Sequence, residues 1–280
     1  MKLIAYIFFL FLCQFTLAQN TYLSFTENKG QWNNNVQYRA KLPAGDLFLE
    51  SNKLTYQFYR ETDLDRIDDL HHGTLENPSK EDSIINLHAF NVTFVNSLVP
   101  KLTATKPLST YENYYLGNDK NKWASNVKKY QVVEYQELYK GINLKFYQSN
   151  NTLKYDFIIA PNEDITQIKL KYNGAESTTI KDGHLYVKTS VNTLIENKPF
   201  AYQEINGSKK EVQCNYVLKN NTLSFEFPKG YDKNFSLIID PALIFASYSG
   251  AEVGNWGFTS TYDETGHLYG AGVVFGAGYQ

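Results

Sequence analysis

Apolar and polar residues alternate with a period of two through most of this chain, and this pattern constrains the fold more than any other feature. It is clear in residues 54–59, 142–147 and 153–159, whereas sustained helical periodicity is almost absent. Successive side chains of a strand point to opposite faces, so the alternation predicts strands with one buried face. The 22 Tyr and 18 Phe, against a single Met, also fit strands better than helices. The pattern therefore predicts an all-β fold.

Turn-forming sequences separate these runs at short intervals. They are SNK at 51–53, KDG at 181–183, NG at 206–207 and NN at 220–221. Asn and Gly accept the positive φ angles of tight hairpin turns, so each sequence predicts an antiparallel hairpin. Short strands with frequent turns are typical of β-sandwiches and barrels. We expect a sandwich-like domain of antiparallel strands over residues 19–241.

Residues 61–83 interrupt the pattern. The segment is acidic, has few β-branched residues, and contains both Gly and Pro. It is expected to be a solvated loop or insertion between two strands. Its carboxylates and the pair His71 and His72 do not have the spacing of a calcium-binding loop, and no metal site is expected there.

The first eighteen residues have the features of a secretory signal. Lys2 precedes an apolar run at residues 3–12, and small residues lead up to Ala18. We expect cleavage between Ala18 and Gln19, secretion or display at the cell surface, and no integral membrane segment in the mature chain. Cys214 is then the one remaining cysteine, so an intrachain disulfide is excluded, and its apolar neighbours predict a buried thiol.

The formal net charge of −2, with both signs interspersed, gives no electrostatic basis for nucleic-acid binding. The sequence contains neither a phosphate-binding glycine loop nor a nucleophile elbow, and no cofactor or metal is expected. Glu134 and Glu137 lie near Asp156 in the sequence, so a catalytic carboxylate pair is one interpretation. Ordinary charges on the solvent face of strands are the other.

The motif W-x-x-N-V occurs twice, with Trp32 and Asn35 in the first copy and Trp123 and Asn126 in the second. Turn formers precede each Trp, and strand-like residues follow each Val. One interpretation is a clamp at the start of a strand, in which each indole covers the end of the sheet. The alternative is a pair of exposed indoles that stack on sugars.

Several short motifs follow one another in a specific order along the chain. They are FTENKGQW at 25–32, NYYLGND at 113–119, YKGINL at 139–144, YDF at 155–157, PFAYQ at 199–203 and LIIDP at 237–241. This succession resembles the N-terminal domain of secreted Bacteroidetes proteins that carry SBBP-type β-propeller repeats. After Asp240 and Pro241, SYSG at 247–250 and DETGHLYGAG at 263–272 resemble the first such repeat, although Ala251 replaces a usual glycine. The resemblance implies that residues 242–280 form an incomplete first propeller-type repeat, and that the chain is a fragment of a longer protein.

The resemblance implies an architecture and a location but no catalytic residues. We expect a non-enzymatic structural or binding module for adhesion or glycan contact, with surface polysaccharide or other cell-surface proteins as partners. The candidate contact or structural residues are Trp32, Trp123, Asn35, Asn126, Asp240 and Pro241. The alternative is an extracellular carbohydrate-active enzyme that uses Glu134, Glu137 or Asp156.

Overall fold

The computed structural model describes residues 23–75, 77–115, 117–149 and 152–241, together with three later strands. These strands are β19 (Leu243–Phe245), β20 (Asn255–Tyr262) and β21 (Leu268–Val274). The expected signal segment and its cleavage point lie outside the described residues, as does the propeller-type repeat apart from these strands. No helix among the described residues is long and apolar enough to cross a membrane.

Within the described ranges the fold is all-β, as predicted, and most strands belong to one sheet of 15 antiparallel strands. Its members are β1 (Phe25–Glu27), β2 (Val36–Leu42), β3 (Gly45–Glu50), β4 (Lys53–Tyr59), β5 (Leu87–Phe94), β6 (Lys101–Tyr114), β7 (Ala124–Tyr139), β8 (Ile142–Ser149), β9 (Thr152–Ile159), β10 (Leu170–Asn173), β14 (Phe200–Ile205), β15 (Ser208–Val212), β16 (Asn215–Lys219), β17 (Thr222–Glu226) and β18 (Leu237–Asp240). Their order is β15-β14-β18-β9-β8-β7-β1-β2-β3-β4-β5-β10-β17-β16, and β6 pairs with β7.

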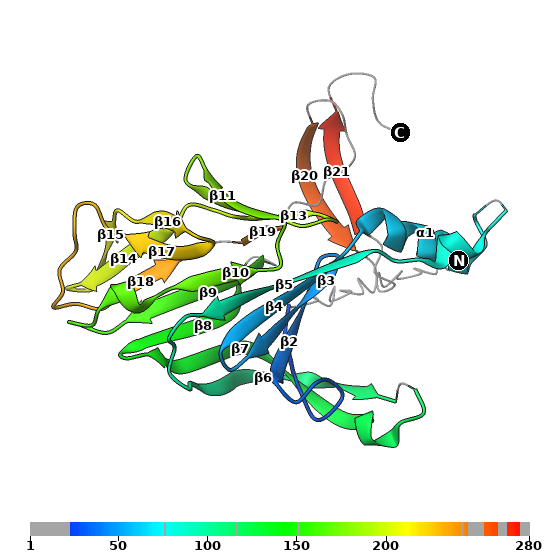
Figure 1. Ribbon diagram of the computed structural model, residues 1–280, viewed down its shortest axis with the longest axis horizontal. Coiled ribbons are helices and arrows are strands. Elements are labelled where there is room, and N and C mark those ends of the chain that lie inside the picture. The colour runs from blue at the N-terminus through cyan, green and yellow to red at the C-terminus, as the bar shows by residue number, and fades with distance from the viewer. Residues whose placement is uncertain are drawn as a thin grey trace, which may run out of the picture.

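A smaller sheet contains β11 (Ser177–Lys181), β12 (His184–Lys188), β13 (Thr193–Glu196) and β19. Strands β20 and β21 pair with each other. The helical segments are α1 (Glu61–His72) and the single 3₁₀ turns η1 (Lys80–Ser83), η2 (Lys120–Lys122) and η3 (Ile165–Gln167). In Figure 1 the hairpin of β6 and β7 runs along the lower edge, and the strands β14 to β18 lie at the opposite end from α1.

The alternation in the sequence corresponds to the two faces of the strands. In β4, for example, Leu54, Tyr56 and Phe58 are buried while their neighbours in the strand are half-buried. Three of the predicted turns also have the backbone angles expected of them. Asn206 and Gly207 have φ angles of 53° and 75°, and both central residues of the turns at 182–183 and 220–221 have positive φ as well. Such angles match the right-handed twist of hairpin strands.

The large sheet folds over on itself, so that two of its parts face each other across an aromatic core. Phe94 of β5 packs edge-on against Tyr135 of β7 with ring centroids 5.6 Å apart, and Phe157 of β9 meets Phe225 of β17 at 5.8 Å. The Tyr135 hydroxyl donates a hydrogen bond across the layers to the backbone oxygen of Glu50 at 2.9 Å. This two-layer arrangement agrees with the predicted sandwich-like fold.

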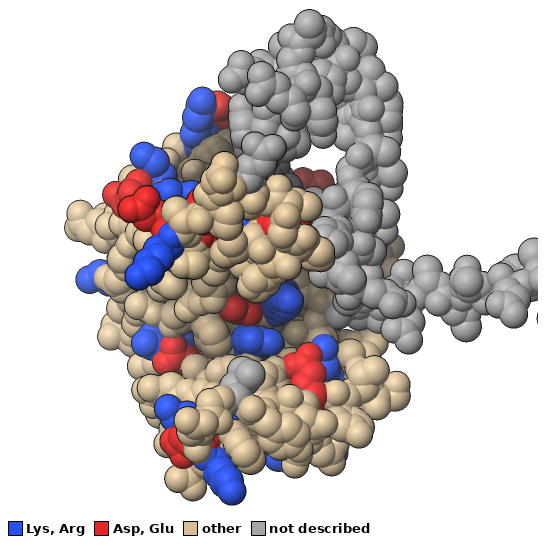
Figure 2. All heavy atoms as spheres, turned by 90° about the vertical axis from the view of Figure 1, so that its right-hand side faces the viewer, with Lys and Arg blue, Asp and Glu red and all other residues tan. Residues whose placement is uncertain are grey.

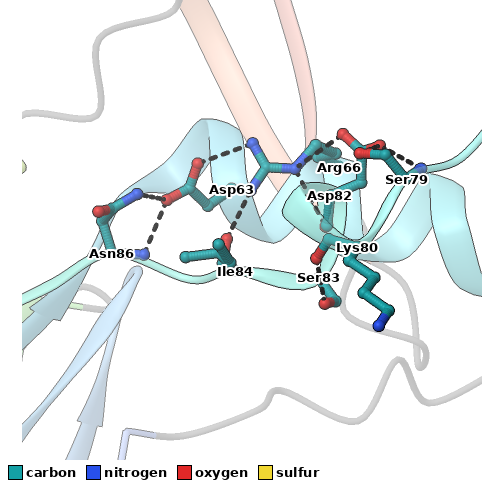
Figure 3. Close-up of polar contacts among 8 residues, drawn as sticks. All are labelled: Asp63, Arg66, Ser79, Lys80, Asp82, Ser83, Ile84 and Asn86. Atoms are coloured by element: carbon teal, nitrogen blue, oxygen red, sulfur yellow. Dashed lines mark hydrogen bonds and ion pairs between the residues drawn. The ribbon is translucent and has the colours of Figure 1, made fainter.

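The composition of residues 61–83 predicted a solvated loop or insertion. The structure shows that this segment includes helix α1 and the turn η1. Residues 61–72 lack Gly and Pro, and Gly73 ends the helix with a φ angle of 68°. Figure 3 shows the hydrogen bonds and ion pairs that the charged residues of this segment form. The Arg66 guanidinium donates to the buried Asp63 carboxylate at 3.0 Å, and Asn86 donates to the same carboxylate from its backbone and side-chain nitrogens. These bonds from Asn86 hold the pKa of Asp63 below its usual value and tie the helix to the start of β5.

Cys214 lies between β15 and β16 and is buried and unpaired, as its apolar neighbours predict. Burial raises the pKa of its thiol to about 12. A thiol with so high a pKa is protonated at neutral pH and behaves as a small apolar side chain.

Candidate functional site

The first W-x-x-N-V copy lies in the loop between β1 and β2, and Asn28 organises this loop. The Asn28 side-chain oxygen accepts hydrogen bonds from the backbone nitrogens of Gly30 and Trp32, at 3.0 and 3.2 Å. Its side-chain nitrogen donates to the backbone oxygens of Asn33 and Val36. Asn35 is exposed, and its backbone nitrogen donates to the Asn33 side chain. The side chain of Asn28 therefore holds the loop in place, along with two backbone hydrogen bonds, from Asn28 to Gln37 and from Val36 to Asn33.

This loop places Trp32 on the outer face of the large sheet, where the indole is half-buried among neighbouring side chains. Its ring packs edge-on against Phe48 of β3 and Tyr114 of β6, with centroids 6.3 and 5.5 Å away. The Arg39 guanidinium lies over the indole at 4.8 Å, which is within the range of a cation–π contact. Side chains from three strands contact Trp32, which favours a structural role, but the ring lies on the face of the sheet and not at its end as the clamp interpretation expected.

A charged network surrounds the Trp32 contacts. Arg39 pairs with Asp46 at 3.6 Å and donates to the Tyr114 hydroxyl at 3.4 Å. That hydroxyl donates to Glu112, whose carboxylate also pairs with Lys129 at 2.8 Å. Burial acts to raise the pKa of Glu112, but the hydrogen bonds from Lys129 and Tyr114 outweigh it, so the pKa lies below its usual value.

The second copy lies at the end of the β6–β7 hairpin, where Asp119 caps the turn η2 by accepting from the Asn121 backbone at 3.0 Å. The Trp123 indole N–H donates to the Gly117 backbone oxygen at 3.2 Å, and the ring meets Tyr115 edge-on at 5.7 Å. Lys120 lies 5.8 Å from the indole centroid. Trp123 is 38% exposed, and these neighbours, Tyr115, Gly117 and Lys120, belong to the same end of the hairpin.

Two further aromatic side chains are exposed at this end of the hairpin. Tyr111 is 59% exposed and Tyr115 is 58% exposed. Glu112 and Tyr114, which alternate with them along the chain, contact the Trp32 group instead. We call Tyr111, Tyr115 and Trp123 the aromatic end of the hairpin. Tyr115 packs against Trp123, and Tyr111 lies four residues before Tyr115 in the sequence. Exposed apolar patches commonly mark interaction sites.

The two W-x-x-N-V copies, far apart in the sequence, lie next to each other in space. The Lys29 ammonium of the first loop donates to the Ser125 backbone oxygen at 3.0 Å. Asn126 is exposed and takes a φ angle of 53°, and its backbone nitrogen donates to the Asn113 side chain at 2.8 Å. Figure 1 shows the loop before β2 beside the hairpin end at the lower right. Asn35 lies in a turn, whereas Asn126 lies within β7, where the pairing with β6 is irregular.

The carboxylates considered for catalysis lie on the outer face of the sheet and are held by different partners. Glu134 accepts from the Asn143 side chain at 3.0 Å, and Glu137 accepts from the Gly141 backbone at 3.1 Å. Asp156 accepts from the Tyr147 hydroxyl at 3.0 Å. The β-strand register places Lys145 between Glu134 and Asp156, so two strand spacings, about 10 Å, separate their backbones.

Asp240 lies on the same outer face as Asp156. Both of its carboxylate oxygens accept from the Lys154 ammonium at 3.1 Å, and the next residue, Pro241, is buried. Burial raises the pKa of Asp156 to about 6, and the negative charge of Asp240 adds to the effect. No group of three or more His, Cys, Asp or Glu arranged to hold a metal ion occurs among the described residues.

Sequence reasoning missed Glu196, a carboxyl that is only 2% exposed, at the junction of the two sheets. It accepts hydrogen bonds from Tyr155 at 2.8 Å, Tyr216 at 3.3 Å and Tyr172 at 3.4 Å. Burial raises the pKa of Glu196 to about 7, although these three hydroxyls act to lower it. A charged residue in the same alternation as buried Leu194 was the available signal.

A comparison with protein families agrees with the extent of the β-rich domain. The family described as a domain of unknown function, DUF7948, matches residues 25–242. No curated protein and no solved structure matches the chain. Because the family match spans more than half of the 280 residues, this chain belongs to the DUF7948 family.

Proposed function

We propose that this chain is a non-catalytic binding module of a secreted or cell-surface protein, and that its aromatic end contacts polysaccharide. The module precedes a β-propeller, a context supported by the repeat-like motifs at 247–250 and 263–272. Export is supported by the signal-like residues 1–18, and exported protein should begin at Gln19 when its intact mass is measured.

The observation that carries the proposal is the exposure of Tyr111, Tyr115 and Trp123 at one end of a long hairpin. Burying such rings in a core would stabilise the fold, whereas leaving them in water forgoes that contribution. A sugar ring presents a face of C–H groups that carry small positive charges, and the face of an aromatic ring is negative. The two surfaces therefore attract and also exclude water between them.

The local contacts hold the Trp123 ring in place before any ligand arrives. Its N–H is bonded to Gly117, and Tyr115 packs against it edge-on. A side chain that is already ordered loses little rotamer freedom on binding, so less of the contact energy is spent on ordering it. This arrangement suits weak recognition of a flat, polar ligand.

Affinity electrophoresis through gels that contain neutral or acidic polysaccharides tests the proposal. At least one polymer should retard the parent chain, and Trp123→Ala should weaken this retardation by roughly tenfold, equivalent to about 1.4 kcal/mol. Tyr202→Ala is the matched control, because Tyr202 is an aromatic residue of β14, lies beneath Lys209 at 4.1 Å, and is outside the aromatic end. Equal retardation of parent and Trp123→Ala would count against the proposal, as would the absence of retardation by every polymer.

An extracellular carbohydrate-active enzyme is the second candidate function, with Asp156, Glu134 and Glu137 as its acids. The observation in its favour is the raised pKa of Asp156, about 6, beside Asp240. A carboxyl with such a pKa holds a proton at mildly acid pH, as a general acid requires. Release of sugar products by the purified chain, abolished by Asp156→Asn or Glu134→Gln, would establish the enzyme and displace the non-catalytic proposal.

A further inference from the structure

The lysines around the aromatic end indicate which kind of polysaccharide it binds, an inference that rests on the proposed function. Residues 101–130 contain six lysines and two acidic residues, a formal net charge of +4, whereas the whole chain carries −2. The rest of the hairpin, residues 131–139, adds Glu134 and Glu137, so the positive charge lies toward the end of the hairpin that carries the aromatic rings. Figure 2 looks onto this side of the molecule, with the hairpin end in its lower part.

The two acidic residues within 101–130 are already engaged, but most of the lysines in this range form no ion pair within the described residues. Glu112 pairs with Lys129, and the Asp119 side chain caps η2. Lys106, Lys120, Lys122 and Lys128 are exposed, and none forms an ion pair within the described residues. Lys120 lies 5.8 Å from the centroid of the Trp123 indole, so its charge is beside the ring, and none of the four is neutralised by an ion pair within the described residues.

We infer that the aromatic end selects acidic polysaccharides, those with carboxylate or sulfate groups, over neutral ones. The rings provide a stacking surface for the sugar, and the lysines beside them attract the negative groups along the polymer. Exposed charges act over about 8 Å at physiological ionic strength, so lysines near the rings contribute without direct contact. Such attraction weakens as salt is added.

Two pairs of polymers that differ in charge on the same backbone test this inference. They are polygalacturonate with its methyl ester, and dextran sulfate with dextran. At least one charged polymer should bind the parent chain about tenfold more tightly than its neutral counterpart, and the difference should shrink at high salt. The double variant Lys120→Gln and Lys122→Gln should reduce the preference, whereas Lys209→Gln, on β15, should leave it unchanged.

The outcomes separate this inference from the proposed function. Equal binding of charged and neutral polymers, still lost in Trp123→Ala, overturns the charge preference and leaves the polysaccharide module intact. If the parent chain binds none of the polysaccharides, both the proposed function and the charge preference are overturned. Tighter binding of single-stranded oligothymidylate than of either acidic polymer also overturns the inference, because nucleic acids are recognised by the same combination of rings and cations.

A different observation, the Glu196 cluster, carries a second inference. Glu196 ends β13 in the small sheet, and its three tyrosine partners come from β9, β10 and β16 of the large sheet. A small cavity lies beside the carboxyl and is lined mostly by apolar side chains. The volume that the centre of a water molecule can occupy in it is about 10 Å³. The neighbouring strand β19 pairs with β13 in the register of Glu196 and Leu243. The carboxyl therefore connects the two sheets where the chain leaves the domain.

The titratable groups around this carboxyl are all tyrosines. The carboxyl accepts hydrogen bonds from Tyr155, Tyr172 and Tyr216, and Tyr56 of β4 lines the same cavity. No Lys, Arg or His among the described residues forms an ion pair with Glu196. An ionised carboxylate here has hydrogen bonds but no opposite charge. Burying such a charge costs free energy, because the carboxylate loses its contact with water. Ionisation therefore favours an open state in which the carboxylate is hydrated.

We also propose that a proton on Glu196 holds the small sheet against the large one, and that loss of this proton loosens β12, β13 and β19. In the closed protein the carboxyl has a pKa of about 7, and an exposed glutamate has one of 4.5. Opening is therefore least favourable below pH 4.5, becomes more favourable as the pH rises, and changes little above pH 7. The full change in the opening constant is on the order of a hundredfold.

Amide hydrogen exchange at pH 5 and pH 8, corrected for intrinsic rates, measures this opening. Protection of Val187 and Leu194 should fall by up to a hundredfold at pH 8, whereas Leu144 of β8 should keep its protection. Tyr172→Phe removes a hydroxyl that stabilises the carboxylate and should increase the loss, and Glu196→Gln should abolish the pH dependence. Equal protection of β12 and β13 at both pH values would overturn the proposal, as would a parallel loss in β8.

Discussion

The two W-x-x-N-V copies share a motif and a location, yet their tryptophans differ in environment. Trp32 is half-buried beneath Arg39 and beside Phe48 and Tyr114, whereas Trp123 is 38% exposed and contacts Tyr115 and its own loop. The motif residues lie in a turn before β2 in the first copy and at the start of β7 in the second. The strands beside each indole determine its contacts, so the same short motif places one ring against three strands and leaves the other partly exposed at a hairpin end.

Truncation of each indole should give the largest difference between the copies. Trp32→Ala removes contacts to three strands and should lower the free energy of unfolding by about 2–3 kcal/mol, less than the roughly 3–5 kcal/mol of a fully buried ring. Trp123→Ala should cost less than about 1 kcal/mol because the contacts of this ring are with its own hairpin end and its ring is 38% exposed. Urea unfolding of both variants measures these values. Equal losses would show that the two copies are energetically equivalent.

Removal of the cation beside each indole should give a smaller difference. Arg39→Ala breaks a cation–π contact together with bonds to Asp46 and Tyr114, and should destabilise the chain by about 1–2 kcal/mol. Lys120→Ala removes an exposed contact and should change stability by less than about 0.5 kcal/mol. Losses of the same size in denaturant unfolding would contradict the assignment of the structural role to Trp32 alone.

Acid should weaken the Trp32 copy through Glu112. Because the folded pKa of Glu112 lies below its unfolded value, its contribution is present above the unfolded pKa of about 4.5 and is lost as the pH falls through the folded pKa. Glu112→Gln should therefore reduce the acid-induced loss of stability, with an effect below about 1 kcal/mol at neutral pH. Asp119→Asn near Trp123 serves as the control. An unchanged pH profile in Glu112→Gln would exclude this contribution.

Fluorescence quenching distinguishes the indoles with the smallest perturbation. Trp123→Phe should remove more acrylamide-quenchable emission than Trp32→Phe, because the exposed indole meets the quencher more often. Trp256 contributes the same background to both variants. If Trp32→Phe removes more quenchable emission, Trp32 is the more accessible indole in solution and does not have the structural role.

The strands could be predicted from the sequence because apolar residues alternate with polar ones wherever one face of a strand is buried. Leu54, Tyr56 and Phe58 of β4 are an example. The loop or insertion expected at residues 61–83 contains a helix at 61–72, and composition did not show it because Asp63 is held by Asn86, which lies 23 residues away in the sequence. The sequence also left the tryptophans undecided, since exposure of each ring depends on strands distant in sequence. Glu196 was missed for the same reason: Tyr155, the partner with the shortest hydrogen bond, lies 41 residues away.

The position of β18 has a consequence for the order in which the chain can fold during synthesis. This strand, among the last of the domain to be made, pairs with β9 on one side and β14 on the other, in the interior of the sheet. Until residue 240 has emerged, one edge of β9 and one edge of β14 have no partner strand. Unpaired strand edges are prone to pair with other chains. The sheet also depends on contacts between distant residues, which form slowly. Completion of the sheet must therefore follow synthesis of the whole domain, and a nascent chain that stalls before β18 would be at risk of aggregation.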